Sequence, residues 1–314
     1  MSEKRGIAIL GVFVADLAFR AERMPAMGET IFGSGFKLGP GGKGSNQAVA
    51  AARLDTPVTF ISRLGADDFA RVARQTWERE GIVTRVAVSA DRPTGAAFIF
   101  VDENSGDNAI IVVAGAAGQI GPADVEAAAD AIRSAAVFVT QLEQPAAAAE
   151  RGLAIAREAG TLTVLNPAPA APVPDSIYAL CDYVTPNEHE ASLLTGIAVT
   201  GPEEARNAAD VFLARGAGAA VVTLGSAGAL LHSRHESVLI PAFRAGPVVE
   251  TTGAGDAFNA GFLWAWLRGE PLPRCLLAGN ICGALSTRAA GGTAAFPTLR
   301  ELHAALRKVE RALA

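Results

Sequence analysis

The sequence predicts an α/β protein with a mostly parallel central sheet flanked by helices, and three observations support this. Short apolar runs rich in β-branched residues alternate with alanine-rich helical stretches through most of the 314 residues. Continuous apolar strands separated by helices are typical of a parallel sheet that is covered on both faces. Half of the residues are hydrophobic and 19% are charged, so the chain has enough apolar side chains for a large core.

The expected strands and helices alternate along the chain. The strands of the main sheet are expected at Ile7–Val14, Val58–Ser62, Val137–Thr140, Thr161–Leu165, Tyr183–Thr185 and Ala220–Leu224. The helices between them are expected at Gly44–Leu54, Asp67–Glu80, Pro122–Ser134, Ala146–Ala159 and Glu203–Arg215, and further helices near 256–268, 271–290 and 298–313. The strand runs are short and β-branched, whereas the helical stretches are longer and rich in alanine. Residues 166–175 form a loop, because their prolines cannot lie inside a helix.

Two segments break the alternation and predict a second, small sheet. Residues 28–40 and 95–113 alternate like antiparallel strands, and DENSGDN within the second segment is a strong hairpin signal. A sheet this small is not stable alone, so we expect it to cover the ligand site or to pair with a second subunit. The apolar side chains expected to be exposed on it are Ile31, Phe36, Phe98 and Phe100. The expected organisation is one domain, 1–314, with this lid inserted at about 15–40 and 95–113.

Composition and charge exclude several classes of partner. The net charge is −5 and no run of lysine or arginine occurs, so nucleic acid is not expected to bind. No stretch reaches the roughly 18 uninterrupted apolar residues of a membrane span. The N-terminal apolar run resembles the start of a signal peptide, but Asp16 interrupts it and a buried strand explains it better. Three cysteines without a C-x-x-C pair indicate buried thiols in a reducing compartment, so we expect a cytoplasmic protein.

The segment ETTGAGDAFNAGF, residues 250–262, combines a glycine-rich turn, one aspartate and an apolar helix. Two interpretations are open from this stretch alone. Asp256 either caps the helix Ala257–Leu267 or belongs to a ligand site, because bare N–H groups at a helix start bind anions. The cap is the more common arrangement.

Separate polar residues follow the expected strands, at the edge where open α/β sheets bind ligands. The usual nucleotide fingerprints, G-x-x-x-x-G-K-[ST] and G-x-G-x-x-G after the first strand, are absent. The polar or glycine positions are Asp16, Gly41, Gly42, Lys43, Asn46, Glu143, Asn187, Glu190, Gly225 and Gly228. Each is explained singly as a turn or cap residue, but their common position at one sheet edge favours a shared site.

Two segments, GGKGSNQAVAAARL and ETTGAGDAFNAGF, resemble the two signature motifs of the ribokinase (PfkB) family of carbohydrate kinases. TQLE, NPAPA, TPNEHEASLLTG and VVTLGSAGAL also resemble ribokinases in order and spacing, so the resemblance covers essentially the whole chain. GGKGSNQA and NPAPA favour the ribokinase branch. The resemblance implies a ribokinase-like fold, with a small β-sheet lid on the mostly parallel sheet, and a homodimer joined through that lid.

The resemblance also implies a role for each site residue. Asp256 is the general base that takes the proton of a sugar hydroxyl attacking the γ-phosphate of ATP, and the N–H groups of Gly253, Ala254 and Gly255 form an anion hole. The implied sugar-binding residues are Asp16, Gly42, Lys43, Asn46, Glu143 and Asp256. The implied nucleotide-binding residues are Asn187, Thr223, Gly225, Gly228, Gly255 and Asn280, and Glu190 acts on Mg²⁺, through water.

This chain departs from the family pattern at two places. Ribokinases usually carry asparagine where this chain has Val14, and the 2-deoxyribose kinases of the family carry an apolar residue there. The family's activating potassium site uses an aspartate where this chain has Glu250, and a serine near Ala295, although the carbonyl of Thr252 is still a possible ligand. We therefore expect weaker activation by potassium than in an ordinary ribokinase.

The sequence therefore predicts an ATP- and Mg²⁺-dependent sugar kinase that phosphorylates the primary hydroxyl of a small furanose, most simply D-ribose to D-ribose 5-phosphate. The alternative that Val14 favours is a kinase of 2-deoxyribose or of another pentose or polyol. An alternative from a different class is a sugar- or nucleotide-binding protein without catalysis. The intact segment 253–256 weighs against it, because a binding protein does not need the base.

Overall fold

The computed structural model describes residues 5–313 and contains a large sheet and a small one. The large sheet has nine strands in the order β13-β12-β11-β10-β9-β8-β1-β4-β5. Its parallel strands are β1 (Ile7–Leu10), β4 (Val58–Leu64), β5 (Val83–Val88), β8 (Val137–Thr140), β9 (Leu162–Leu165), β10 (Tyr183–Val184) and β11 (Ala219–Thr223). The antiparallel hairpin of β12 (Ala229–Ser233) and β13 (Ser237–Ile240) continues the sheet at one edge. The expected mostly parallel sheet is confirmed.

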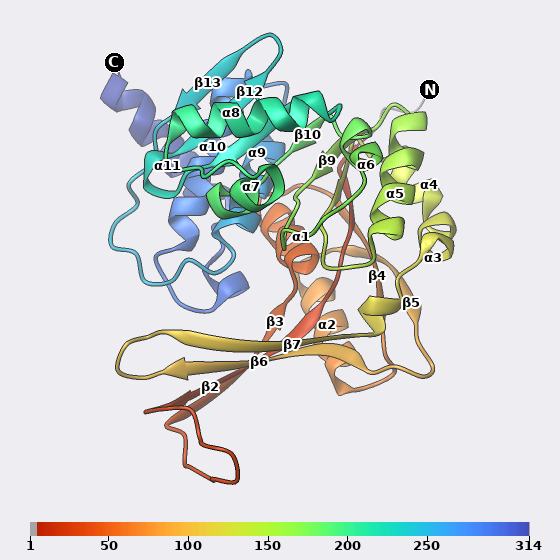
Figure 1. The fold of residues 1–314 in the computed structure, drawn as a ribbon, viewed down its shortest axis with the longest axis vertical. Helices are drawn as coiled ribbons and strands as arrows, with labels where there is room; N and C mark the ends of the chain where they lie inside the picture. Colours follow the sequence, from red (N-terminus) through yellow and green to blue (C-terminus); the bar gives the residue numbers. More distant parts are fainter. Residues whose placement is uncertain (1–4, 314) are drawn as a thin grey trace.

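Helices cover both faces of the large sheet, as the ribbon in Figure 1 shows. One face packs against α1 (Lys43–Arg53), α2 (Asp68–Arg79), α9 (Ala254–Trp266), α10 (Leu272–Ser286) and α11 (Leu299–Leu313). The other packs against α3 (Pro122–Ala127), α4 (Ala129–Ser134), α5 (Ala146–Glu158), α6 (Asp175–Ala179), α7 (Glu188–Thr195) and α8 (Pro202–Ala214). Successive β1 side chains alternate between two cores, because strand side chains have a period of two. Ile7 and Ile9 enter the first core, and Ala8 and Leu10 enter the second.

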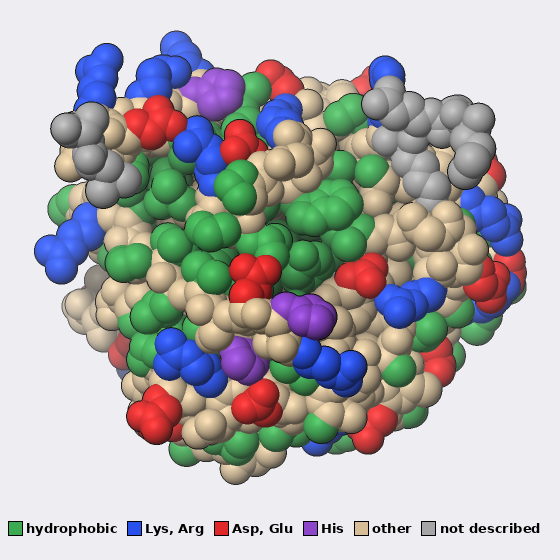
Figure 2. Space-filling model, turned by 90° about the horizontal axis from the view of Figure 1, so that it is seen from above, with side chains coloured by type: hydrophobic (Ala, Val, Ile, Leu, Met, Phe, Trp, Pro, Cys, Tyr) green, Lys and Arg blue, Asp and Glu red, His purple; other side chains and the backbone are tan. Residues whose placement is uncertain are grey.

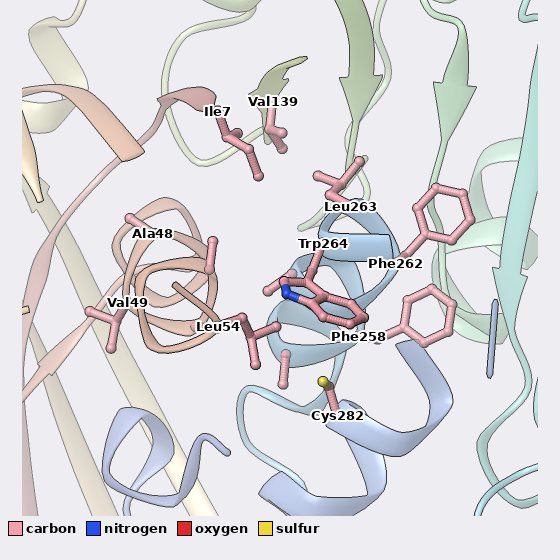
Figure 3. Close-up of a cluster of buried hydrophobic side chains, with 14 of the residues drawn as sticks. Ile7, Ala48, Val49, Leu54, Val139, Phe258, Phe262, Leu263, Trp264 and Cys282 are labelled. Carbon is pink, nitrogen blue, oxygen red and sulfur yellow. The ribbon is translucent and has the colours of Figure 1, made fainter. Parts of the chain in front are cut away.

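The first core holds α1 and α9 against each other beneath the site. Figure 3 shows Leu54, the residue that follows α1, directed toward α9 and its Trp264, while Val49 points to the opposite side of α1; all three side chains are buried in the same core. These two helices carry the signature segments GGKGSNQ and GAGD at their N-terminal ends. Packing in the core therefore brings together two motifs that lie about 210 residues apart in the chain.

The bounds of two expected elements are wrong. The expected strand Ile7–Val14 ends at Leu10, because Gly11 packs against Gly44, residues 11–13 belong to no strand, and Val14 begins a strand of the other sheet. Asp16 therefore lies within that second strand and does not follow the first. The expected helix Pro122–Ser134 is broken at Ala128 into α3 and α4. Strand β5 was not expected; it lies at the edge of the sheet and is largely exposed.

The small sheet has the strand order β3-β2-β6-β7 and projects from the body of the molecule (Figure 1). Its strands are β2 (Val14–Ala21), β3 (Gly35–Gly41), β6 (Thr94–Asp102) and β7 (Asn108–Gly115). The hairpin expected at DENSGDN joins β6 to β7 in antiparallel pairing and is confirmed. Of the four expected exposed side chains only Phe36 is exposed: Ile31 and Phe98 are half-buried, and Phe100 is buried.

The surface seen in Figure 2 carries charges of both signs, and the three cysteines are buried. On the face seen in Figure 2, acidic and basic side chains are interspersed around a central area of hydrophobic side chains. Cys181, Cys275 and Cys282 are buried and free. None of the helices within residues 5–313 has the length and hydropathy needed to cross a bilayer.

The expectation of a single domain remains a prediction, and residues 1–4 and 314 of its range 1–314 lie outside the described residues.

Candidate active site

Asp256 lies in the first turn of α9 and is buried, with 6% of its surface exposed. Each of its carboxylate oxygens accepts one side-chain amide N–H from α1: Asn46 Nδ2 donates to Oδ2 at 3.1 Å and Gln47 Nε2 donates to Oδ1 at 3.0 Å. The capping interpretation is wrong, because the N-cap is Gly253, whose φ of 80° favours glycine. Asp256 is instead a buried carboxylate held between two helix starts.

The glycine turn before Asp256 presents the start of α9 to open space. The first N–H groups of a helix have no intrahelical acceptor. The Ala254 N–H donates to the Thr251 carbonyl at 3.1 Å, so it is occupied in this conformation. Gly255 is exposed, and a Cβ added there would meet no atom within 4 Å, so this part of the helix start is open. Thr252, which is exposed, leads into this turn.

Asp16, Lys43 and Glu143 gather next to Asp256. The backbone N–H of Lys43, at the first position of α1, donates to Glu143 Oε2 at 2.7 Å. Gly42 caps α1 with a φ of 88°, and a Cβ there would lie 2.5 Å from the carbonyl oxygen of Val12. A Cβ at Gly41 would lie 2.3 Å from Asp16 Oδ1, so a larger residue at position 41 would displace the Asp16 carboxylate.

Burial raises the pKa of every carboxyl group in this cluster. Burial and the nearby Glu250 raise the pKa of Asp16 to about 6. Burial raises the pKa of Glu143 to about 7, against the lowering effect of the Lys43 N–H and ammonium. Burial also raises the pKa of Asp256, while Lys43, Asn46 and Gln47 favour its ionised form. The site therefore combines three partly or fully buried carboxyl groups with one ammonium, and is suited to binding hydroxyl groups and taking up a proton.

A cavity of about 1070 Å³ extends from Gly255 to the antiparallel edge of the large sheet. Its lining includes all six residues expected to contact a nucleotide: Asn187, Thr223, Gly225, Gly228, Gly255 and Asn280. Asn280 Nδ2 donates to the carbonyls of Ile240 and Pro241 at 2.9 and 3.0 Å, so this amide anchors the loop that walls the cavity. A Cβ at Gly228 would collide with Ile240 O, so the same loop requires glycine there.

Asn187 and Glu190 form a reciprocal capping box at the start of α7. The Asn187 side chain accepts from the Glu190 N–H at 2.8 Å, and Glu190 Oε2 accepts from the Asn187 N–H at 2.9 Å. The cap interpretation of Asn187 is therefore correct, and Asn187 lines the cavity as well. Burial raises the pKa of Glu190, which is also close enough to Lys43 and Asp256 to be influenced by both.

Glu250 lies near the sugar-side carboxylates but is engaged in a loop contact. Its Oε2 accepts the Gly291 N–H at 2.9 Å. Lys37 of β3 lies against the same glycine, since a Cβ there would collide with its ammonium. Ala295, in the 3₁₀ helix η3 (Gly292–Ala295), contributes no side-chain oxygen to this region.

Sequence reasoning missed four residues of the site. Gln47, Gln141 and Asn166 are buried side-chain amides behind Asp256, and Phe258 lines the cavity. Gln47 stands within the signature segment, directly after Asn46, and this position was the only available signal. Gln141 and Asn166 directly follow the neighbouring strands β8 and β9, but no spacing rule connects them before the sheet order is known.

The family model described as pfkB family carbohydrate kinase matches residues 4–299. The chain belongs to this family. Mouse ribokinase is 37% identical over 310 residues, 97% of this chain and 95% of the mouse protein. Deoxyribokinase of Salmonella typhi is 34% identical over 299 residues, 95% of this chain and 97% of that protein. The structure of Arabidopsis thaliana ribokinase complexed with ribose and ATP superimposes with a TM-score of 0.89 at 28% identity, covering 97% of this chain and 99% of that one.

The expected ribokinase-like fold is thus confirmed, and the protein is a ribokinase-like carbohydrate kinase. This finding favours catalysis over the alternative of a binding protein without activity. The relatives include enzymes named for ribose and for deoxyribose at similar identity, so the choice between these sugars depends on individual residues.

Proposed function

We propose that the enzyme transfers the γ-phosphoryl group of ATP to the primary hydroxyl of D-ribose and forms D-ribose 5-phosphate. The observation that carries this proposal is the position of Asp256. Its buried carboxylate is close enough to Lys43 and Glu143 of the cluster to interact with their charges, and the residues directly before it, Ala254 and Gly255, line the 1070 Å³ cavity. A sugar in the cluster and a nucleotide in the cavity would meet at this carboxylate.

In the proposed reaction, Asp256 accepts the proton of the attacking hydroxyl. The hydroxyl oxygen forms a bond to the γ-phosphorus, the bond from that phosphorus to the β–γ bridging oxygen breaks, and ADP leaves. Phosphoryl transfer depends mostly on positioning and charge stabilisation. The Gly255 N–H and the positive end of α9 supply that stabilisation. The raised pKa of the buried Asp256 makes its carboxylate a better proton acceptor than an exposed one.

The test is Asp256→Asn, which keeps the shape and removes the base. We expect the variant to bind ATP and ribose with affinities close to those of the wild type, and to lose at least about a hundredfold in kcat. Steady-state kinetics together with calorimetric titration of both ligands measures the two effects. Turnover within a fewfold of the wild type would remove Asp256 from the mechanism.

Mg²⁺ is proposed as the cofactor that accompanies ATP, and the residues present fit it. Within residues 5–313 no group of three or more His, Cys, Asp or Glu side chains forms a metal cage. This suits an ion held chiefly by phosphate oxygens and water, with Glu190 contributing through water. When bound, Mg²⁺ neutralises negative charge on the phosphates. Asn187 and Glu190 order the start of α7 at the cavity wall by their capping box.

The residues present fit a potassium site less well than they fit Mg²⁺. The carboxylate of Glu250 already accepts a backbone N–H from Gly291, and Ala295 has no side-chain oxygen. The carbonyl of Thr252 is the remaining ligand that we proposed. We infer that potassium activates this enzyme weakly.

A 2-deoxyribose kinase is the second candidate, and Val14 favours it. Val14 is 6% exposed, at the start of β2, two residues before Asp16. It pairs with Gly41 on one side and Gly95 on the other, and its Cγ1 lies 3.0 Å from where a Cβ of Gly95 would be. An apolar side chain here offers no hydrogen bond to a sugar hydroxyl.

We propose a homodimer that pairs two small sheets. Residues in register across a sheet share a face, and one row runs Leu38, Leu17, Phe98 and Ile111. Leu38 is 40% exposed and Ile111 is 62% exposed on this face, with Phe36 at 59% in the next row. A second copy of the same apolar face would cover these side chains.

A cytoplasmic location is proposed as well, supported by the use of ATP and by the three free thiols.

A further inference from the structure

A row of three buried side-chain amides is joined to Asp256 by hydrogen bonds, and none of the three lines the cavity. Gln47 is 2% exposed, Gln141 is fully buried and Asn166 is 7% exposed. Gln47 belongs to α1, Gln141 directly follows β8, and Asn166 directly follows β9. Burying an amide without hydrogen-bond partners costs free energy, so a row of three such amides requires a reason.

Gln47 stands at the centre of this row, with every polar group of its side chain paired. Its Nε2 donates to Asp256 Oδ1 and to Asn166 Oδ1, each at 3.0 Å, and its Oε1 accepts from Gln141 Nε2 at 2.7 Å. An ionised carboxylate only accepts hydrogen bonds, so the NH₂ group of Gln47 must face Asp256. Asn166 is oriented in turn, because its Nδ2 donates to the Thr185 carbonyl at 2.8 Å. The orientation of Gln47 is therefore determined from both ends.

Two glycines make room for this arrangement. Gly11, after β1, and Gly44, in α1, approach so closely that a Cβ on Gly44 would lie 2.6 Å from Gly11 Cα. A Cβ on either would also lie within 2.9 Å of Gln141 Oε1. The backbone is therefore shaped to admit the Gln141 side chain, which holds the oxygen of Gln47.

We propose that Gln47 is a positioning residue: it holds the Asp256 carboxylate in the orientation that receives the proton of the sugar hydroxyl, without touching sugar or nucleotide. At 2% exposure it has no surface with which to contact a ligand. This inference rests on the proposed role of Asp256 as the base. Asn46 donates to the other oxygen of Asp256 but is also an expected sugar ligand, so Gln47 is the residue whose action on Asp256 can be separated from binding.

The same contact influences the charge of Asp256. The charged groups near it are Lys43, which favours the Asp256 carboxylate, and Glu143 and Glu190, whose own pKa values are raised by the Asp256 charge. The Gln47 N–H also favours the carboxylate, so removing it raises the pKa of Asp256. Because the base must be ionised to act, the acid limb of the pH–rate profile then moves to higher pH.

The experiment compares Gln47→Met with Gln144→Met. Gln144 is a matched control: it is 4% exposed, and its Nε2 donates to Thr140 Oγ1 and to the Gln141 backbone carbonyl, not to Asp256. A hydrogen bond to a charged group contributes enough for us to expect a fall in kcat of about ten- to a hundredfold and an acid limb about one pH unit higher in Gln47→Met. KM for ribose and ATP should stay within about threefold. Gln144→Met should lose stability to heat but keep the acid limb of the wild type.

Gln47→Glu covers the case in which Gln47→Met does not fold, because it keeps the shape and replaces the donor by a like charge. Its acid limb should also move upward. An acid limb and kcat like those of the wild type in either Gln47 variant, or an equal shift in Gln144→Met, overturns the proposal. If Asp256→Asn itself retains activity, the assignment of the base fails instead, so the two failures are distinguishable.

Discussion

Val14 is the residue on which the choice between ribose and 2-deoxyribose depends, because it is buried beside Asp16 and carries no polar atom. If its side chain faces the sugar, the extra hydroxyl of ribose is buried without a partner, at a cost of about 1–3 kcal/mol. The wild type should then use 2-deoxyribose at least as well as ribose. Val14→Asn should shift the ratio of kcat/KM toward ribose by about ten- to a hundredfold.

A substrate panel of ribose, 2-deoxyribose, other pentoses and polyols measures this shift. Val14→Ala is the control, since it removes apolar surface without adding a hydrogen-bonding group, and its preference should stay within a fewfold of the wild type. An unchanged ratio of kcat/KM in Val14→Asn would show that residue 14 does not discriminate between ribose and 2-deoxyribose.

At the scale of elements, the first N–H group of α1 donates to the carboxylate of Glu143, and folding raises the pKa of this carboxyl group. Glu143 accepts the Lys43 N–H, yet burial raises its pKa from 4.5 to about 7. A carboxyl group with a raised pKa in the folded state contributes stability that is fully present below its unfolded pKa and is lost as the pH rises through its folded pKa. The ligand-free enzyme should therefore lose stability between about pH 4.5 and 7, as Glu143 ionises.

Glu143→Gln removes this titration. The fall in the unfolding temperature between pH 5 and pH 8 should be smaller in this variant than in the wild type by a few degrees. Calorimetric scans of both proteins without ligands measure the difference. Glu301→Gln, which changes a carboxyl group whose pKa is lowered at the start of α11, is a control that should not reduce the fall. Parallel curves for wild type and Glu143→Gln would contradict the assignment.

The loop from α10 to α11 is the element at which potassium would act. Because Glu250 is engaged by Gly291 and Ala295 lacks a side-chain oxygen, replacing sodium by potassium at constant ionic strength should raise kcat by less than about twofold. Glu250→Asp combined with Ala295→Ser should increase the response. A large, saturable rise in the rate of the wild type with potassium would prove this expectation wrong.

At the scale of the whole molecule, the small sheet leaves an apolar face uncovered in the single chain. Light scattering at micromolar concentration should give the mass of a dimer. Ile111→Lys, at 62% exposure on that face, should shift the equilibrium to monomer by placing like charges across the interface. Val83→Lys, on the edge strand of the other sheet at 53% exposure, should leave the dimer intact. A monomeric wild type would rule out the proposed interface.

Much of the fold could be predicted from local pattern. Apolar runs and alanine-rich stretches placed most strands and helices within a few residues, because burial on both faces of a parallel sheet leaves a direct mark on composition. The wrongly predicted bounds lie where tertiary packing overrides the local pattern. Val14 continues an apolar run, yet the chain leaves β1 at Leu10 and enters the other sheet, because Gly11 packs directly against Gly44 of α1.

The active site shows the same division between what local sequence predicts and what tertiary packing decides. The sequence by itself determined which residues have the chemistry: Asp256 beside a glycine turn, the carboxyl groups of Asp16 and Glu143, and the glycines that admit a close approach. Only the tertiary structure decided that Asp256 is no cap, that Asn187 is one, and that Gln47 reaches Asp256 from a helix about 210 residues away in the chain. The physical reason is that a motif records local backbone requirements. A hydrogen bond between distant side chains depends on sheet order and helix packing, which no short segment contains.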